Sequence, residues 1–177
     1  MVDIWSGVIS RSSLVANDSE GLQMMRQSLA MMLMALACLL QSGGAAIAAN
    51  LVKKPSLHTV ATTMDRLENA LAAKNISVIA RVDHAASAAK VDMTLRPTTL
   101  LIFGNPALGT PLMQQNQLVG LSLPMKVLAW RDEGGQVWLA YQHPRAIAAA
   151  HGLDPQQDMI EKMAKGLDNL TETAARQ

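Results

Sequence analysis

The chain has 177 residues, a length that suits one domain, with 15 basic and 14 acidic side chains and a formal charge of +1. This balance argues against a nucleic-acid-binding protein, in which basic residues are clustered and in excess. Hydrophobic residues make up 50% of the chain, so there is enough apolar surface to bury and intrinsic disorder is excluded as well.

The N-terminal part of the chain predicts an export signal. Arg26 is followed by a stretch without charge, whose apolar core, Ser28–Leu40, is shorter than the roughly 20 residues of a membrane span. Ala46-Ile47-Ala48 then provides an Ala-x-Ala cleavage site. We therefore expect residues 24–48 to be a signal peptide and the mature protein to be periplasmic or secreted, with no stable membrane span after cleavage. A retained membrane anchor and a buried helix are the alternatives.

The residues before this signal, 1–23, contain three acidic side chains, which are unusual ahead of a signal core. Translation from Met24 or Met25 would give the usual short positive start, and an extended leader is the alternative. The single cysteine, Cys38, lies inside the apolar core. The mature chain therefore has no disulfide, no zinc–cysteine cluster and no cysteine nucleophile.

The first half of the mature chain predicts one helix and two strands. Thr59–Lys74 carries apolar residues at helical spacing, and we expect this stripe to face the core: Val60, Met64, Leu67 and Leu71. Ile76–Asp83 alternates apolar and polar residues, as a half-buried strand does. Ala85–Lys90 forms either a helical turn or a loop. Thr98–Phe103, entered through Pro97, predicts the strongest strand of the chain.

The second half predicts a helix, a hairpin and two further helices. We expect Leu112–Val119 to be helical. Lys126–Arg131 and Gln136–Tyr141 flank a turn with two glycines and predict a β-hairpin. Pro144–Ala150 predicts a short helix. A last helix is expected from Asp154 onward, with an apolar stripe of Ile160, Met163, Leu167 and Leu170.

The elements follow roughly the order β-α-β-β-α-β-β-α-α, in which the first strand precedes the Thr59–Lys74 helix. The hairpin and the mixed order favour an α+β fold, with an antiparallel-rich mixed sheet and helices packed on it, over a doubly wound parallel sheet.

Several phrases of this sequence resemble one known family. They are Asp83-His84, Arg96-Pro-Thr-Thr-Leu-Leu-Ile-Phe-Gly-Asn-Pro106, Gly109-Thr-Pro-Leu-Met113, Leu123-Pro124 and Tyr141-x-x-Pro144. They are similar to the DUF302 family, and the resemblance defines a domain over residues 49–153, followed by a C-terminal helix at 154–177. The resemblance implies a compact α+β domain, often exported in bacteria and dimeric. It implies no catalytic residue, because the family has no established reaction.

The loop after the strongest strand is the best candidate site. Gly104 and Gly109 have the spacing of the glycines in a phosphate-binding loop, and the start of a following helix offers N–H groups to an anion. Thr110 and Pro111, however, stand where such a loop needs its lysine and its Mg²⁺-binding hydroxyl. An enzyme that hydrolyses nucleoside triphosphates is therefore excluded.

The same loop has a purely structural interpretation. Asn105 would cap a helix beginning at Pro106, or Thr110 would cap one beginning at Pro111, and capping is what such residue pairs most often do. The binding hypothesis is instead a small polar cleft beside the loop, able to hold an anion.

A second cluster of polar residues lies around Asp83, His84 and Arg96. A carboxylate beside an imidazole orients it as a base or a ligand in some enzymes. The alternative is a hydrogen-bonded loop in which Arg96 pairs with Asp83. We assign no catalytic residue, and the expected ligand-binding set is His84, Arg96, Gly104, Asn105, Gly109 and Thr110.

The other histidines, His58, His143 and His151, show no metal-ligand spacing, so we expect no metal and no cofactor. The leading hypothesis is an exported, non-catalytic domain that binds a small molecule, in particular an anionic one. The second is a dimeric structural or interaction protein without a ligand. The third is an enzyme that uses His84 and Asp83.

Overall fold

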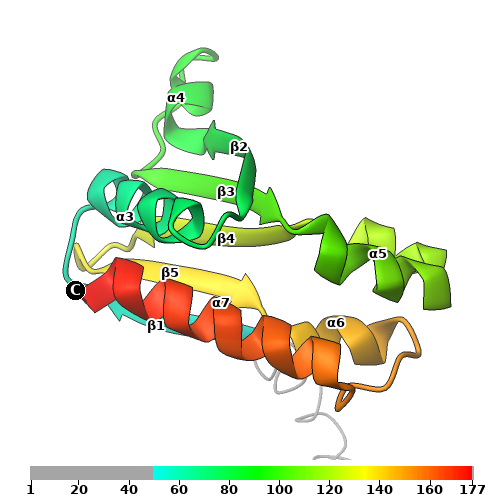
Figure 1. Cartoon of the computed structure of the whole chain (residues 1–177). Coiled ribbons are helices and arrows are strands. Elements are labelled where there is room, and N and C mark those ends of the chain that lie inside the picture. The colour runs from blue at the N-terminus through cyan, green and yellow to red at the C-terminus, as the bar shows by residue number, and fades with distance from the viewer. Residues whose placement is uncertain (1–49, 177) are drawn as a thin grey trace, which may run out of the picture. The chain divides into compact units, whose positions relative to one another are not determined.

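The computed structural model of the chain describes residues 50–176, and the export segment expected at 24–48 lies outside them. Figure 1 shows a sheet flanked by helices. The strands are β1 (Leu51–Ser56), β2 (Ser77–Asp83), β3 (Thr98–Gly104), β4 (Met125–Arg131) and β5 (Val137–Gln142). The helices are α3 (Val60–Ala72), α4 (His84–Ala89), α5 (Pro106–Gln115), the 3₁₀ helix η1 (Gln117–Leu121), α6 (Pro144–Ala150) and α7 (Asp158–Arg176).

The sheet has the strand order β1-β5-β4-β3-β2, and every neighbouring pair is antiparallel. The α+β prediction is confirmed, while the sheet of the described residues is antiparallel throughout rather than mixed. The predicted hairpin is β4 and β5. Its turn is closed by the bond from the Asp132 amide to the Gln136 carbonyl (2.9 Å), and Gly135 adopts φ +83° there, a conformation that glycine accepts without steric cost.

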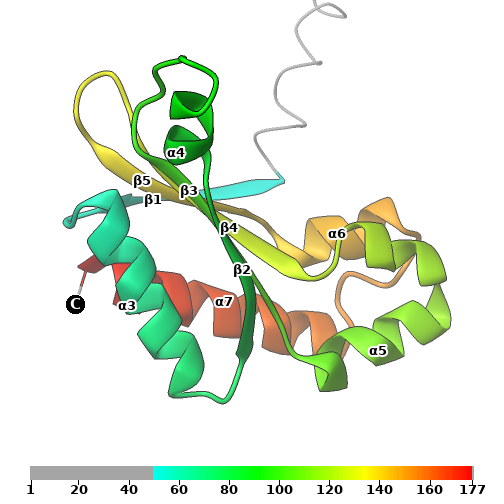
Figure 2. The ribbon, with the colours of Figure 1, turned by 90° about the horizontal axis from the view of Figure 1, so that it is seen from above.

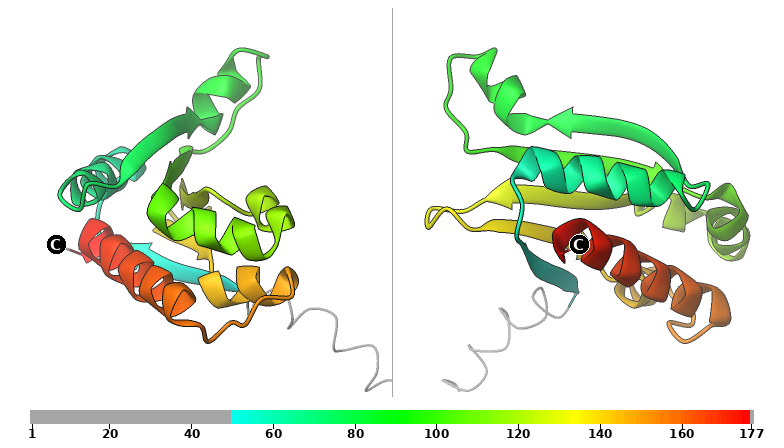
Figure 3. Two further views of the ribbon diagram at one scale, coloured as in Figure 1. Left: turned by 45° about the vertical axis from the view of Figure 1, so that its right-hand side comes forward. Right: turned by 60° about the vertical axis from the view of Figure 1, so that its left-hand side comes forward.

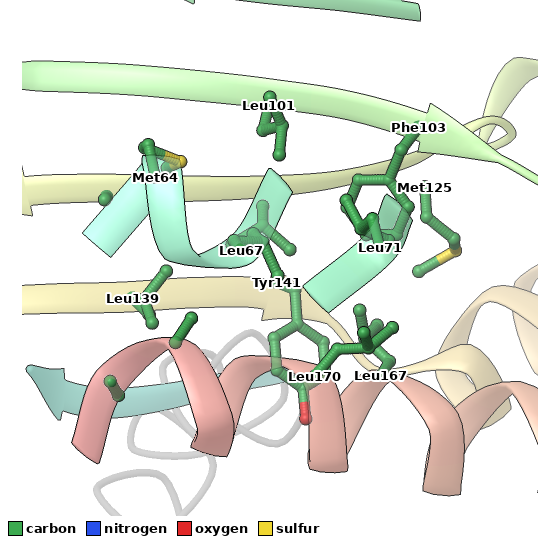
Figure 4. Close-up of a cluster of buried hydrophobic side chains, with 14 of the residues drawn as sticks. Met64, Leu67, Leu71, Leu101, Phe103, Met125, Leu139, Tyr141, Leu167 and Leu170 are labelled. Atoms are coloured by element: carbon green, nitrogen blue, oxygen red, sulfur yellow. The ribbon is translucent and has the colours of Figure 1, made fainter. Parts of the chain in front are cut away.

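The predicted stripe of the first helix faces the core. Thr59 caps α3 by accepting a hydrogen bond from the Thr62 amide (3.2 Å). Met64, Leu67 and Leu71 are 0% exposed. In Figure 4 these side chains belong to one cluster that also contains residues of the sheet and of α7.

The last helix, α7, begins at Asp158, later than the Asp154 that the sequence predicted. Asp154 instead accepts a hydrogen bond from the Gln156 amide (2.9 Å) and forms a turn ahead of the helix. From there α7 runs beside α3 on one side of the sheet (Figure 2). Lys54 of β1 connects to it by an ion pair with Asp168 (2.7 Å).

The opposite face of the sheet is also apolar. The strand register places Val82, Leu100, Leu128 and Ala140 in one row across four strands. All four are half-buried rather than buried. An antiparallel sheet with one solvated face normally carries polar residues there, so this face is unusually hydrophobic over β2–β5. On β1 the row ends in Lys53, whose ammonium group lies 3.7 Å from the centre of the Trp138 ring.

Candidate functional site

The loop that the sequence singled out is the start of a helix. Asn105 is the N-cap of α5, and Pro106 occupies the first helical position. The helix expected at Leu112–Val119 therefore begins earlier, and Pro111 lies inside it. An Asn cap followed by proline is a strong start signal, and here it outweighs the disruption that an interior proline causes.

The N–H groups at the start of α5 already have acceptors. The Asn105 side chain accepts from the Ala107 amide (2.9 Å), and the Asn105 carbonyl accepts from the amides of Leu108 and Gly109 (3.0 Å each). Pro106 has no N–H to offer. Of the two interpretations of this loop, the structure thus shows the cap formed by Asn105, and the helix start does not present open donors to an anion.

A cavity of about 410 Å³ nevertheless lies beside this loop. It is formed between α5 and α7, where β2, β3 and β4 meet the loops at one end of the sheet; Figure 3 shows α5 at this end. Most of its walls are apolar side chains and glycines. They are Ile76, Ile79, Phe103, Gly104, Pro106, Leu108, Gly109, Met113, Gly120, Leu123, Pro124, Met125, Met163, Gly166, Leu167 and Leu170.

The polar wall residues are few. They are Ser77, Asn105, Thr110 and Lys162, and the amide oxygen of Asn105 is already used by the cap. The polar cleft expected beside the loop is thus a largely apolar pocket. The reason is that both α5 and α7 turn apolar residues toward the end of the sheet, and the floor is shared with the hydrophobic core.

Missing side chains on the walls contribute to the hollow. A Cβ added at Gly166 of α7 would have no heavy atom within 4 Å, whereas one added at Gly104 would lie 3.2 Å from the Cβ of Pro124. Three wall residues are methionines, Met113, Met125 and Met163. Methionine side chains are flexible and polarisable and adapt to guests of different shape.

Lys162 is the one charged residue of the wall. Its neighbour Glu161 receives two hydrogen bonds from the Arg145 guanidinium (2.6 and 2.7 Å). These bonds hold the pKa of Glu161 below its usual range, although desolvation acts in the other direction. The carboxylate of Glu161 therefore pairs with Arg145 of α6. No ion pair of Lys162 occurs within residues 50–176.

The two other predicted site residues lie at the opposite end of the sheet. Arg96 precedes β3, whereas Gly104 ends it, and a strand of this length spans about 20 Å. Arg96 donates to the Arg131 carbonyl (3.2 Å) and lies 3.5 Å from Glu133. His84 follows β2, where that strand pairs with the beginning of β3. The expected convergence of His84 and Arg96 with the loop is therefore not what the structure shows.

Asp83 does not orient the imidazole of His84 in this structure. Its carboxylate caps α4 by accepting from the Ala86 amide (2.9 Å). The expected Asp83–Arg96 pair is replaced by this cap on one side and by the Arg96–Glu133 contact on the other. The arrangement is a pair of loop-stabilising contacts rather than an acid–base pair.

A different serine–histidine pair lies near the pocket. The Ser122 hydroxyl is 2.8 Å from His151 Nε2, a distance at which an imidazole can take a proton from a hydroxyl. The described contacts place no carboxylate on the other ring nitrogen. Asn116 donates to the His151 carbonyl (2.8 Å), so these contacts connect η1 to the end of α6. Between residues 50 and 176, no three side chains of His, Cys, Asp or Glu come together as a metal site.

A family model identifies the protein family to which the chain belongs. Residues 52–170 match the model described as domain of unknown function DUF302. The chain belongs to the DUF302 family. The matched range extends past Leu153 into α7 as far as residue 170, so the part of the helix that supplies Lys162 and Gly166 lies inside the DUF302 match.

A solved structure shows the same fold. The crystal structure of an uncharacterised conserved DUF302 protein from Bacillus stearothermophilus superposes with a TM-score of 0.63 at 18% identity, covering 70% of this chain and 97% of that one. At this identity the likeness shows the fold of the DUF302 domain and not its function.

Curated relatives come from Brucella. Proteins named fluoride-specific ion channel FluC 1 from Brucella suis and Brucella abortus are each 41% identical to this chain over 130 residues, 73% of its length. The match takes in 51% and 48% of those proteins, so the chain spans about half the length of the curated relatives it matches. Between residues 50 and 176, no helix combines the length and hydrophobicity that a bilayer crossing requires.

Four of the six residues expected to bind a ligand line the pocket: Gly104, Asn105, Gly109 and Thr110. Sequence reasoning missed the contribution of α7, because Met163 and Leu167 were assigned to a core stripe. One signal pointed to it. Gly166 interrupts the apolar face of a long helix, where glycine is unfavourable unless the absence of a side chain has a use.

Proposed function

We propose that this DUF302 domain is a non-catalytic binding module that takes a small, largely apolar molecule into the pocket between α5 and α7. One observation carries the proposal: the apolar cavity of about 410 Å³ at the end of the sheet. Natural ligand pockets fall in this size range and have mostly hydrophobic walls with a few polar groups.

The size of the pocket limits the guest. If each non-hydrogen atom takes about the 30 Å³ of a water molecule, 410 Å³ holds about 14 such atoms. The pocket therefore suits a short alkyl chain or a small ring system with a head group. The methionine walls favour a flexible guest over one of fixed shape.

The test is to fill the pocket from α7. In Gly166→Leu, the new side chain enters the cavity without a clash at Cβ. The matched control is Asn169→Leu, an exposed position of the same helix that does not line the pocket. We expect decanol or decanoate to raise the melting temperature of the wild type and of Asn169→Leu, and to leave Gly166→Leu unchanged. Equal responses from all three proteins would place the binding elsewhere and refute the proposal.

We also propose that the domain is exported. Support comes from the sequence of residues 24–48, with its short apolar core after Arg26 and its Ala46-Ile47-Ala48 cleavage site. Expressed in a bacterium with an intact secretion system, the protein should be found in the periplasm with its N-terminus at Ala49 or Asn50. A full-length cytoplasmic product would contradict this proposal.

A second candidate function is that of a dimeric interaction protein. It is favoured by the apolar outer face of the sheet, where Trp130 and Trp138 are cross-strand partners next to the row that contains Leu100 and Leu128. An apolar patch of this kind is typical of a protein–protein contact. Light scattering should then show a dimer that Leu128→Lys converts to a monomer, whereas a monomeric wild type would exclude this function.

A further inference from the structure

We infer that the guest of the pocket is an amphipathic anion, an aliphatic carboxylic acid of about ten carbons whose carboxylate pairs with Lys162. This inference rests on the proposed function, because it requires that the pocket binds a ligand. It adds the chemical class of the ligand and its orientation.

The first argument is the position of the charge. Lys162 is the only residue of the wall with a full charge, and it is exposed on the first half of α7. Because Lys162 both lines the apolar pocket and is exposed, we expect its methylene stem to lie along the wall and its ammonium group to reach water, the usual behaviour of lysine at the boundary of a hydrophobic surface. An anionic head group gains more from this ammonium group than an uncharged one, because the hydrogen bond is then between two charged groups.

The second argument is that nearby acidic groups leave Lys162 available. Glu161 is bonded to Arg145 at 2.6 and 2.7 Å. Asp158, one turn earlier on α7, does not line the pocket and is not within ion-pair distance of Lys162. The backbone N–H groups of Ala107, Leu108 and Gly109 are occupied by the Asn105 cap. The full positive charge that an acidic head group meets on this wall is therefore on α7 and not on the glycine loop.

The third argument is the gradient of burial along α7. From exposed Lys162 the wall passes to Leu167 (4% exposed) and Leu170 (3% exposed), with Phe103 (3%) on the opposite strand. Eight residues of helix cover about 12 Å. One end of the pocket thus meets water and a cation, and the other end meets the hydrophobic core, which is the polarity of a fatty acid.

The length of the chain follows from the volume. About 14 non-hydrogen atoms fit in 410 Å³ at about 30 Å³ each, and a carboxylate uses three of them. This leaves room for about 11 further carbons, so an acid of about ten to twelve carbons fits. Longer acids would have to leave their ends in water or displace core residues.

The experiment compares decanoate with decanol, which have the same chain length and differ in the charge of the head group. Affinities are measured by calorimetry at pH 7.5, where decanoate is ionised, for the wild type, Lys162→Gln, Lys162→Arg and Gly166→Leu. Lys165→Gln is the matched control, since Lys165 is exposed on the same helix and does not line the pocket. Thermal unfolding establishes that each variant is folded.

We expect the wild type, Lys162→Arg and Lys165→Gln to prefer decanoate over decanol by about two- to five-fold, the range for one exposed ion pair. Lys162→Gln should lose this preference while still binding decanol. Added salt should weaken decanoate binding in the wild type and leave decanol binding unchanged.

Two outcomes would overturn the inference separately from the proposed function. If decanol binds as tightly as decanoate to the wild type, or if the preference survives in Lys162→Gln, the head-group assignment is wrong and the pocket remains a binding site. If neither compound binds the wild type, or if Gly166→Leu binds both normally, the proposed function fails and the inference fails with it.

Discussion

Two regions of this domain, the α3–α7 region and the α5 end, use hydrophobic residues in opposite ways. Between α3, α7 and the middle of the sheet, Met64, Leu67, Leu71, Leu101 and Leu139 are 0% exposed and fill the interior. At the α5 end, one residue of the whole helix, Leu112, is buried. Five other residues of that helix, Pro106, Leu108, Gly109, Thr110 and Met113, border a cavity of about 410 Å³.

The contacts that connect these two regions to the rest of the domain also differ. The α3–α7 region is stabilised by close apolar packing, whose loss is expensive. The α5 end is connected by polar contacts at the surface, such as Gln115 to Gln157 (3.1 Å) and Arg145 to Glu161. A region that must admit a ligand is expected to have low local stability, so the contrast supports a binding role for the α5 end.

The largest expected effect is that of a truncation in the filled region. Leu67→Ala should lower the free energy of unfolding by about 2–5 kcal/mol, because the side chain is fully buried and leaves a cavity. Leu108→Ala, on the wall of the pocket, should cost about 1 kcal/mol or less, because Leu108 is only half-buried and already borders empty space. Urea denaturation measures both values.

Equal losses in these two variants would contradict the comparison. They would mean that the α5 end is as closely packed as the core and that the pocket is closed in solution. A loss within about 0.5 kcal/mol for Leu67→Ala, the range of unremarkable surface changes, would instead place the α3 stripe in solvent.

The filled region is also the region that could be predicted from the sequence. Local periodicity determines which face of α3 is apolar, and β4 and β5 are joined by a short turn with two glycines, so both elements were correctly predicted. The edge strand β1 was harder to delimit, because its sequence Leu-Val-Lys-Lys-Pro-Ser has charges and a proline that suit an edge as well as a loop.

The pocket could be predicted only on one side. The Gly104–Thr110 loop is a local pattern and identified the α5 wall. The α7 wall comes from residues more than fifty positions later, and Met163 and Leu167 have the same spacing whether they face a core or a cavity. The failure with Arg96 has a different cause. Arg96 precedes the strand and Gly104 ends it, so the length of the predicted strand already separated the two residues by about 20 Å.

Two glycine substitutions test the same contrast and should have smaller effects, of opposite sign, on the free energy of unfolding. Gly104→Ala places a Cβ 3.2 Å from that of Pro124 and should lower the free energy of unfolding by about 1–3 kcal/mol. Gly166→Ala adds a Cβ in open space within α7 and should raise it by about 0.5–1 kcal/mol, the gain of alanine over glycine in a helix. Destabilisation by Gly166→Ala in urea denaturation would show that the hollow beside α7 is filled in solution.

The smallest expected effect concerns acid. The hydrogen bonds from Arg145 lower the pKa of Glu161, so this pair stabilises the folded state fully above the ordinary glutamate pKa of about 4.3. The contribution is lost as the pH falls through the lower pKa of the folded state, where the carboxylate takes up a proton. Because the pair connects α6 to the first turn of α7 at the hollow end, acid should loosen that end before it affects the α3 region.

Arg145→Gln tests this order of events. In an NMR titration, the variant should show a Glu161 pKa raised toward the ordinary value. Hydrogen exchange at neutral pH should become faster in α6 and the first turn of α7 and remain unchanged in α3, and this difference from the wild type should disappear at low pH. Arg96→Gln is the control, since it breaks the exposed Arg96–Glu133 contact (3.5 Å) at the other end of the sheet. If both variants loosen α3 and α7 equally, the two ends unfold as one unit, and polar surface contacts do not set the stability of the pocket end.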